Sequence, residues 1–214
     1  MTQRILVWDV PTRVFHWLQV LAFGAAYLTA FSERLRNYHV ALGYILLGLL
    51  VFRLLWGFAG TRYARFRSFL FKPGEIVVYL VSMVKGHPLH YLGHNPVGSV
   101  SVWLLLALGM FVSVTGVLAL QDDAGDLVVE LHGVATNVML GVIALHILGV
   151  LMSSIMHREN LVRAMFTGLK FNGFTGLKSG GAENGIQRTY GWLGVLMVIA
   201  VVVFWFVYVR KPLG

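Results

Sequence analysis

The feature that most constrains this chain is a pair of histidines inside one long apolar stretch. His132 and His146 lie fourteen residues apart within residues 131–157, a segment without Asp, Glu, Lys or Arg. Fourteen residues make nearly four turns of α-helix, so both imidazoles project from one face and lie ~21 Å apart along the axis. Since the apolar core of a bilayer is ~30 Å thick, one imidazole falls in each leaflet, where titratable groups usually mark a function.

The composition of the chain also indicates a bilayer. Of the 214 residues, 57% are hydrophobic and 12% are charged, whereas ~25% of the residues of an ordinary soluble domain are charged. Several runs of about eighteen residues or more carry almost no charge, which is the length that a membrane-spanning helix needs. A soluble domain with a very large core is the alternative, and these uninterrupted runs disfavour it.

The residue types and motifs that the sequence lacks exclude several kinds of functional site. The chain has no cysteine, which excludes disulfides, zinc thiolate sites, iron–sulfur clusters and haem attached through thioether bonds. A metal ion would therefore be held by histidine, methionine or carboxylates. The net charge of +8 is explained better by basic loops on one side of a membrane than by a nucleic-acid partner. No phosphate-binding loop, dinucleotide fingerprint or nucleophile elbow is present, so we assign no catalytic residue.

Five membrane-spanning helices are predicted, at residues 14–31, 38–59, 96–120, 127–156 and 192–209. Asp9 and Pro11 precede the first helix as a cap and a first-turn proline. Residues 75–85 are apolar but too short to cross, so we expect them to lie on the membrane surface. The fold class is therefore an all-α membrane protein. Residues 1–170 form a four-helix transmembrane bundle, and residues 171–214 form a connector and a fifth transmembrane helix.

The loop charges predict the orientation. Basic side chains concentrate in loops that fall on one side: Arg4, Arg13, Arg62, Arg65, Arg67, Lys72, Lys85, Arg158, Arg163, Lys170, Lys178 and Arg188. The positive-inside rule makes that side cytoplasmic, which places the N-terminus in the cytoplasm. The turn between the third and fourth spans is acidic and faces outward: Asp122, Asp123, Asp126 and Glu130. The fifth span places Arg210 and Lys211 outside, against the rule.

With this topology, four histidines fall into two pairs at matching depths. His16 and His146 lie toward the inner side, whereas His39 and His132 lie toward the outer side. Two imidazoles that face each other across a helical bundle can fill both axial positions of a haem iron. Oxygen or substrate then finds no open position, so such a haem passes electrons. We interpret the pairs as the ligands of two haems; the alternative for any one histidine is a hydrogen-bonded packing residue.

Gly43 and Arg53 are weaker candidates on the second span. Gly43 lies one turn after His39 and would let a flat cofactor approach the helix, although small residues also pack helices together in membranes. Arg53 lies fourteen residues after His39, on the same face and in the inner half. A buried guanidinium needs an anion, and a propionate of the inner haem would serve. The alternative is that Arg53 extends to the inner interface.

Three further histidines, His87, His90 and His94, occur in the loop sequence GHPLHYLGHNP. Their spacing of three and four residues would suit a surface metal site. No nearby carboxylate or thiolate supports such a site, so we favour histidines at the membrane interface.

Four segments, VWDVPTRVFHW, YHVALGYILLGLLVFRLLWGF, HYLGHNPVG and HRENLVRAMFTG, resemble the bacterial cytochrome b561 family. More narrowly, they resemble its branch similar to the b-type cytochrome subunits of nickel–iron hydrogenases. The similarity covers roughly residues 4–170. It implies two haems b held by four core helices, with axial ligands at His16, His39, His132 and His146. The role of residues 171–214 is not implied.

The resemblance also implies a function. Similar members pass electrons between an outer-side redox partner and the quinone pool, so the expected partners are membrane lipid, ubiquinone or menaquinone, and a periplasmic c-type cytochrome, dehydrogenase or hydrogenase. A standalone superoxide:quinone oxidoreductase is the alternative, and we favour electron transfer over a self-sufficient enzyme. A metal or solute transporter is a third class, disfavoured because the sequence has no inverted repeat or pair of broken helices.

Overall fold

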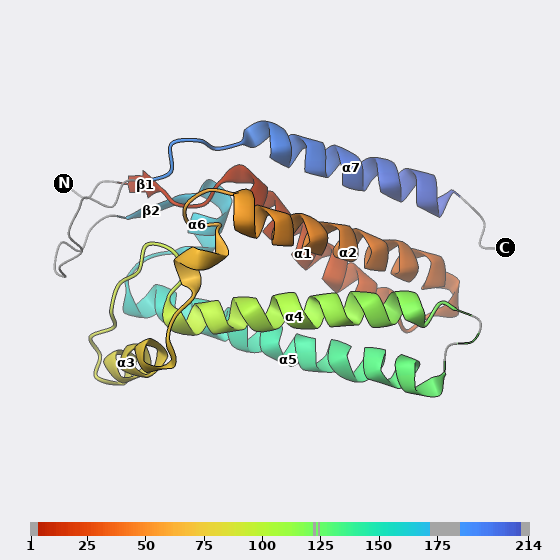
Figure 1. Cartoon of the computed structure of the whole chain (residues 1–214), viewed down its shortest axis with the longest axis horizontal. Helices are drawn as coiled ribbons and strands as arrows, with labels where there is room; N and C mark the ends of the chain where they lie inside the picture. Colours follow the sequence, from red (N-terminus) through yellow and green to blue (C-terminus); the bar gives the residue numbers. More distant parts are fainter. Residues whose placement is uncertain (1–3, 122, 124, 172–184, 211–214) are drawn as a thin grey trace.

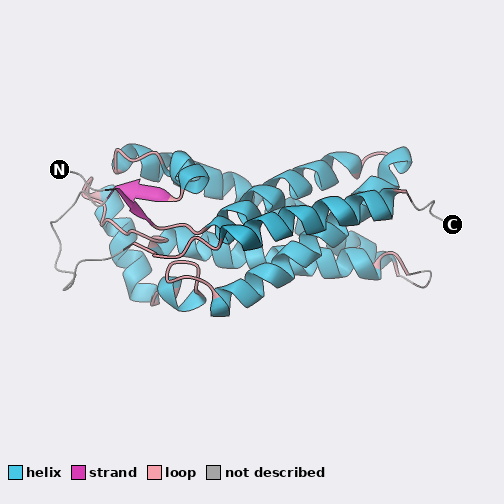
Figure 2. Ribbon diagram, turned by 90° about the horizontal axis from the view of Figure 1, so that it is seen from above, coloured by secondary structure: helices cyan, strands magenta, loops and turns pink. Residues whose placement is uncertain are grey.

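The computed structural model describes residues 4–121, 123, 125–171 and 185–210. Five long helices run side by side along the length of the molecule (Figures 1 and 2). They are α1 (Val10–Thr29), α2 (Arg36–Ala59), α4 (Pro96–Leu118), α5 (Asp126–Met156) and α7 (Gly191–Val209). Each lies within a few residues of a predicted span, so the predicted all-α membrane fold is confirmed.

The short elements are α3 (Pro73–Val84), α6 (Leu161–Thr167), β1 (Arg4–Leu6), β2 (Leu169–Phe171) and the 3-10 helices η1 (Glu33–Leu35) and η2 (Phe66–Phe69). All except η1 gather at one end of the long helices, which we call the strand end (Figure 1). The opposite end, with the α1–α2 and α4–α5 connections, is the turn end. The predicted surface segment is α3, which lies at the strand end and is too short to cross a membrane.

Among the described residues, four helical segments are long and apolar enough to span a bilayer: Glu33–Ala59, Pro96–Leu118, Asp126–Met156 and Gly191–Val209. The first predicted span, α1, falls short of that standard although it has 20 residues. Its first half carries Arg13, His16 and Gln19, which lower its hydropathy. It nevertheless packs closely along α2. A helix can keep such polar groups at membrane depth when they face its neighbours.

Helices α1 and α4 each begin at a capping side chain, with a proline in the first turn. The Asp9 carboxylate accepts a hydrogen bond from the Thr12 backbone N–H at 2.8 Å, with Pro11 in the first turn. Asn95 does the same for Gly98 at 2.7 Å, and Pro96 opens α4. A side-chain oxygen at the cap satisfies an otherwise unpaired N–H, and a proline in the first turn loses no helical hydrogen bond. The cap predicted at Asp9 is confirmed.

The core runs through the middle of the bundle. Leu42, Ile45, Leu46 and Leu49 of α2 are buried against residues of α1, α4, α5 and α7, among them Met139. The outward faces of the helices instead carry exposed large apolar side chains. Such surfaces are typical of helices surrounded by lipid, because water is absent there and the backbone is satisfied within each helix. α7 lies against α1 and α2 and adds a fifth helix to the four-helix core.

The strand end is closed by a pairing that the sequence did not predict. β1 and β2 form an antiparallel pair in which Ile5 lies opposite Lys170. The backbone N–H groups of Val7 and Trp8 donate to the carbonyl of Gly168. Gly168 ends α6 in the left-handed region (φ +80°), where an added Cβ would also meet the Trp8 carbonyl. The start of the chain is thereby fixed to the segment after α5.

Most described basic loop residues lie at the strand end as predicted, but Arg34 and Arg36 lie in the α1–α2 connection at the turn end. The segments with Arg62, Arg65, Lys72 and Arg158 lie at the strand end, and the turn between α4 and α5 lies at the opposite end (Figure 1). Arg210 follows α7 at the turn end. The predicted charges at Asp122, Lys178 and Lys211 lie outside the described residues.

Candidate cofactor-binding site

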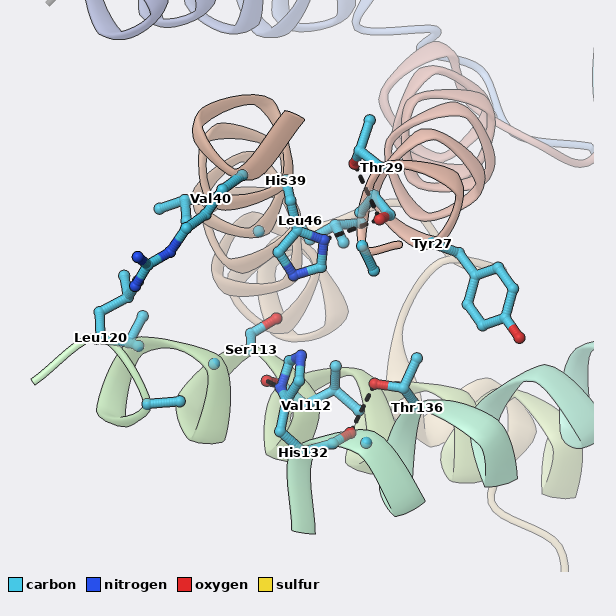
Figure 3. A pocket seen from close by; sticks show the side chains of 18 of the residues that line it. Tyr27, Thr29, His39, Val40, Leu46, Val112, Ser113, Leu120, His132 and Thr136 are labelled. Carbon is cyan, nitrogen blue, oxygen red and sulfur yellow. Dashed lines mark hydrogen bonds between the residues drawn. The ribbon is translucent and has the colours of Figure 1, made fainter. Parts of the chain in front are cut away.

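His39 and His132 face each other at the turn end (Figure 3), and we call them the turn-end pair. His39 is in the first turn of α2 and His132 is in the second turn of α5. Their ring centres are 6.2 Å apart, with the ring planes at 86°. A metal–imidazole bond is ~2 Å long and the ring centre lies ~1 Å beyond the nitrogen, so two rings on opposite sides of one metal ion have centres ~6 Å apart. The observed spacing fits this arrangement.

Both rings of the turn-end pair are oriented by backbone carbonyls. His39 Nδ1 donates to the Ala26 carbonyl at 2.8 Å, and His132 Nδ1 donates to the Val112 carbonyl at 3.0 Å. A carbonyl oxygen only accepts, so Nδ1 carries the proton in each ring and Nε2 keeps its lone pair. This is the arrangement that orients a histidine as a metal ligand. The two donors are therefore ready for a metal ion between them.

A cavity of about 550 Å³ surrounds the turn-end pair and is lined by α1, α2, α4 and α5. Its volume lies in the range of cofactor sites, ~300–1,000 Å³. Gly43 and Gly133 line it, and a Cβ added at either would meet no atom within 4 Å. A Cβ at Gly116 would lie 3.0 Å from Cε1 of His132. Gly43 and Gly133 leave open space for a flat group beside the two imidazoles, whereas Gly116 leaves room for the His132 ring itself. Gly43 lies where such a group was predicted.

The second predicted pair, His16 and His146, lies nearer the strand end, and we call it the strand-end pair. In the described part of the chain the two rings make no direct ring contact, but they are close enough to interact electrostatically. His16 packs edge-on against Trp17 at 5.0 Å, and its Nδ1 is buried without a hydrogen-bond partner. The depth match is therefore retained, but these imidazoles are not oriented by carbonyls as those of the turn-end pair are.

Arg53 lies among aromatic rings near the strand end. Its guanidinium carbon is 5.2 Å from the ring centre of Phe66 and 5.8 Å from that of Phe69. The side chain is 3% exposed, and Nη1 is buried without a hydrogen-bond partner. Because Arg53 ends inside the protein, the predicted alternative of a side chain that reaches the interface is wrong. The buried guanidinium of Arg53 still needs an anion, as predicted.

His94 lies near the same guanidinium, and sequence reasoning missed its position. Its ring centre is 4.8 Å from that of Trp8 and 4.6 Å from that of Phe69, and its Nδ1 is buried without a partner. Burial, together with the nearby positive charge of Arg53, lowers the pKa of His94 to about 3. The neutral imidazole keeps one N–H donor. The one indication in the sequence is that His94 directly precedes Asn95, the cap residue of α4. The cap fixes the backbone at this position.

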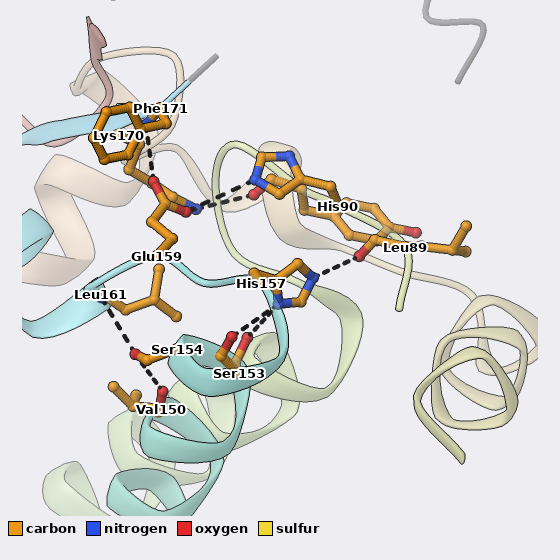
Figure 4. Close-up of polar contacts among 11 residues, drawn as sticks. Leu89, His90, Val150, Ser153, Ser154, His157, Glu159, Leu161, Lys170 and Phe171 are labelled. Atoms are coloured by element: carbon orange, nitrogen blue, oxygen red, sulfur yellow. Dashed lines mark hydrogen bonds and ion pairs between the residues drawn. The ribbon is translucent and has the colours of Figure 1, made fainter. Parts of the chain in front are cut away.

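His87, His90 and His94 do not share a site. His90 contacts Glu159 and His157 instead, with 3.7 Å between His90 Nε2 and a Glu159 oxygen (Figure 4). No group of three or more His, Cys, Asp or Glu side chains suited to a metal ion occurs among the residues that the structure describes. His94 is partly buried and packs against Trp8 and Phe69, whereas His87 is exposed.

Glu159 organises a buried polar cluster with Lys170 and His90 at the strand end (Figure 4). Lys170 Nζ lies 3.6 Å from a Glu159 oxygen and donates to the Tyr91 carbonyl at 3.0 Å. The Phe171 N–H donates to Glu159 at 2.8 Å. Burial acts to raise the pKa of Glu159, but its contacts with His90 and Lys170 outweigh it and lower the value. Burial lowers the pKa of Lys170, partly offset by Glu159. The cluster ties β2 to the loop before α4.

Comparisons with known proteins identify the family. The family model described as prokaryotic cytochrome b561 matches residues 7–168. A probable Ni/Fe-hydrogenase B-type cytochrome subunit of Azotobacter chroococcum mcd 1 is 28% identical, over 57% of this chain and 62% of that protein. The corresponding protein of Rhizobium leguminosarum bv. viciae is 23% identical, over 78% and 88%.

The probable Ni/Fe-hydrogenase 1 B-type cytochrome subunit of Escherichia coli (strain K12) is 22% identical, over 51% of this chain and 57% of that protein. The chain thus spans about three fifths of the length of the first of these relatives. No solved structure matches it. The family match covers α1, α2, α4 and α5 with all four paired histidines, and the chain belongs to the prokaryotic cytochrome b561 family.

Proposed function

We propose that this protein carries electrons across a bacterial inner membrane through two haems b, each held between two imidazoles. The observation that carries the proposal is the turn-end pair, with rings 6.2 Å apart, both Nδ1 atoms bonded to carbonyls, and a cavity between the helices. Membership of a b-type cytochrome family supports haem b as the cofactor. When bound, each haem would supply a one-electron carrier whose potential the protein adjusts.

The strand-end pair would hold the second haem. His132 and His146 lie on one uninterrupted helix, α5, which supports the ~21 Å separation expected from the helical rise. His16 on α1 would complete the strand-end pair, as His39 on α2 would complete the turn-end pair. The four imidazoles would hold the two haems, which would supply one-electron transfer and no substrate chemistry. The work of these histidines would be to position two carriers.

The partners and the orientation extend the proposal. Relatives named as probable Ni/Fe-hydrogenase B-type cytochrome subunits support a redox enzyme as partner. We propose that this partner, or a c-type cytochrome, lies on the periplasmic side and that quinone is the other reactant. Basic loops at the strand end support a cytoplasmic N-terminus. Since the chain has no cysteine, single cysteines introduced at Arg62 and Asp123 can be labelled with a membrane-impermeant reagent in intact cells. Labelling at residue 123 and not at residue 62 is expected.

The central test is the haem content of purified protein in detergent, measured by pyridine haemochrome. We expect two haems b per chain and the low-spin spectrum of six-coordinate iron. His39→Ala and His132→Ala should each remove the turn-end haem, and His16→Ala and His146→Ala the strand-end haem. His87→Ala is the matched control, because that histidine is exposed and belongs to neither pair.

Each outcome bears directly on the proposal. One haem per chain in the four variants, with two in the control, supports it. A colourless wild-type protein, a single haem, or four variants that all retain two haems would overturn it. To test the partners, the reduced protein is mixed with a quinone in the absence and presence of candidate donors. Turnover of superoxide by the purified chain alone would favour the standalone oxidoreductase instead.

A further inference from the structure

Two buried nitrogen donors without acceptors lie beside the strand-end pair. The first is Nη1 of Arg53. The anion nearest to Arg53, the Asp9 carboxylate, interacts with it electrostatically, but it accepts hydrogen bonds from other groups, among them Trp56 at 3.1 Å and Thr61 at 2.6 Å. A buried guanidinium with an unsatisfied N–H is unfavourable unless an acceptor is supplied.

The second nitrogen is Nδ1 of His94, which donates in one tautomer of the neutral ring. The ring packs between Trp8 and Phe69, and the following residues are fixed by the Asn95 cap and the buried Pro96. Packing therefore holds the imidazole, while its Nδ1 has no hydrogen-bond partner. Most buried polar atoms in proteins are hydrogen-bonded, so this exception needs an explanation.

The two donors converge on one region. His94 is close enough to Arg53, His16 and His146 to interact with each of them electrostatically. Both groups also contact Phe69: its ring centre is 5.8 Å from the Arg53 guanidinium carbon and 4.6 Å from the His94 ring centre. A positive guanidinium and a neutral N–H together suit a ligand with negative charge and oxygen acceptors, which is the chemistry of a carboxylate. Haem b carries two carboxylates on its propionate side chains.

We infer that Arg53 and His94 together bind the propionate carboxylates of the haem held by the strand-end pair. This inference rests on the proposed function. It assigns His94 a role that the sequence did not suggest, since His94 looked like a member of a loop histidine group. Donors that neutralise a propionate make reduction of the iron more favourable, because less negative charge then opposes the incoming electron. Removing a donor should therefore lower the potential of one haem only.

The experiment uses the full chain in detergent with an optical redox titration. His94→Phe keeps the aromatic contacts with Trp8 and Phe69 but removes both ring nitrogens, whereas His94→Gln keeps an N–H donor. His87→Phe repeats the chemical change at an exposed position of the same loop. Haem content is measured on every variant. Infrared redox-difference spectra with haem labelled at the propionate carbons add a second readout.

We expect His94→Phe to keep two haems and to shift the ratio of reduced to oxidised strand-end haem, at a fixed ambient potential, fivefold to tenfold toward the oxidised form. For a one-electron couple this corresponds to ~40–60 mV. His94→Gln should restore at least half of that shift, and the other haem and His87→Phe should not change. Arg53→Gln should act in the same direction and more strongly, and both variants should move the labelled propionate bands.

Unchanged potentials and unmoved propionate bands in fully loaded His94→Phe would overturn the inference while leaving the two-haem proposal intact. Equal shifts in His94→Phe and His94→Gln would also overturn it, because they would report a packing effect. If His94→Phe fails to fold, the bands of His94→Gln and Arg53→Gln decide the question. Altered binding of a quinone analogue with unmoved propionate bands would assign the donors to quinone and reject the carboxylate.

Discussion

The two histidine pairs are prepared for a cofactor in different ways. At the turn end, His39 and His132 are oriented by carbonyls of α1 and α4, and an open cavity with glycine walls separates the helices. At the strand end, His16 Nδ1 has no partner, and the surroundings include the buried cation Arg53 and the enclosed ring of His94. The first site depends on the backbone and on empty space, the second on charged and polar side chains.

This difference indicates which kind of substitution should disturb each site. A site made by backbone carbonyls and glycines is disturbed mainly by added volume, since few side-chain substitutions remove a carbonyl. A site made by buried polar side chains is disturbed by a change of charge, because one unpaired buried ion is costly. The four predictions that follow test this contrast, from the largest expected effect to the smallest.

Filling the turn-end cavity should have the largest effect. Gly43→Leu places a side chain where a Cβ now meets no atom, inside the space beside His39. We expect the haem content to fall from two to one per chain, with loss of the turn-end haem and retention of the other, as measured by pyridine haemochrome and redox titration. Gly48→Leu is the matched control on the same helix, because Gly48 is exposed and equally unobstructed. Two haems in both variants would contradict the assignment of the cavity.

Breaking the buried ion pair of the strand end should have the next largest effect. Glu159 and Lys170 are 6% and 5% exposed, so Glu159→Gln leaves a buried lysine without its counter-charge. We expect the free energy of unfolding in detergent to fall by about 3–5 kcal/mol, measured by thermal or denaturant unfolding. The double variant Glu159→Gln/Lys170→Met should recover most of that loss. Equal stabilities of the single and double variants would show that the pair is not coupled.

Changing the cap of α1 should weaken the strand end by a smaller amount. Asp9 is 1% exposed and accepts hydrogen bonds from the Thr12 N–H, Trp56 and Thr61. Asp9→Asn turns one carboxylate oxygen into a donor that faces donors, so we expect a loss of about 2 kcal/mol in unfolding free energy. Redox titration should show a disturbed strand-end haem and an unchanged turn-end haem. A change confined to the turn-end haem would refute the proposed separation of the sites.

Lowering the pH should reduce the stability of the strand end more than that of the turn end. The pKa of Glu159 is lowered in the folded protein by His90 and Lys170 despite the opposing effect of burial. The stabilisation from this carboxylate is therefore complete above the ordinary glutamate pKa, ~4.3, and is lost as the pH falls through the lower folded value. Between pH 6.5 and about pH 3, a range that extends below the ordinary glutamate pKa, the melting temperature of wild type should decrease by more than that of Glu159→Gln. Equal decreases in the melting temperatures of the two proteins would show that Glu159 does not cause the sensitivity to acid.

The sequence predicted the helices well because their signals are local. Runs of apolar residues, the cap at Asp9 and the prolines of α1 and α4 each act within one helix. The approach of His39 to His132 was also predictable, because depth along a helix follows from counting residues. Arg53 was recognised as a buried cation for the same reason. These inferences need no knowledge of how the loops are folded.

The loops of the strand end were not predictable in the same way. The position of His94 depends on contacts with Trp8 and Phe69, which are distant in the chain. β1 and β2 have three residues each and are too short to show an alternating pattern. The Glu159–Lys170 pair joins residues whose burial follows from that strand pairing. Long-range contacts of this kind leave no periodic signal in the sequence.

The pairing of β1 with β2 sets an order for biogenesis. Residues 4–6 reach their partners only after residues 169–171 have left the ribosome, by which time the ribosome has made every helix except α7. Such a distant closure forms late, since a long loop must first be brought together. We therefore expect the strand end to stay open throughout most of synthesis, leaving the neighbouring cofactor site accessible from that side until the first strand docks.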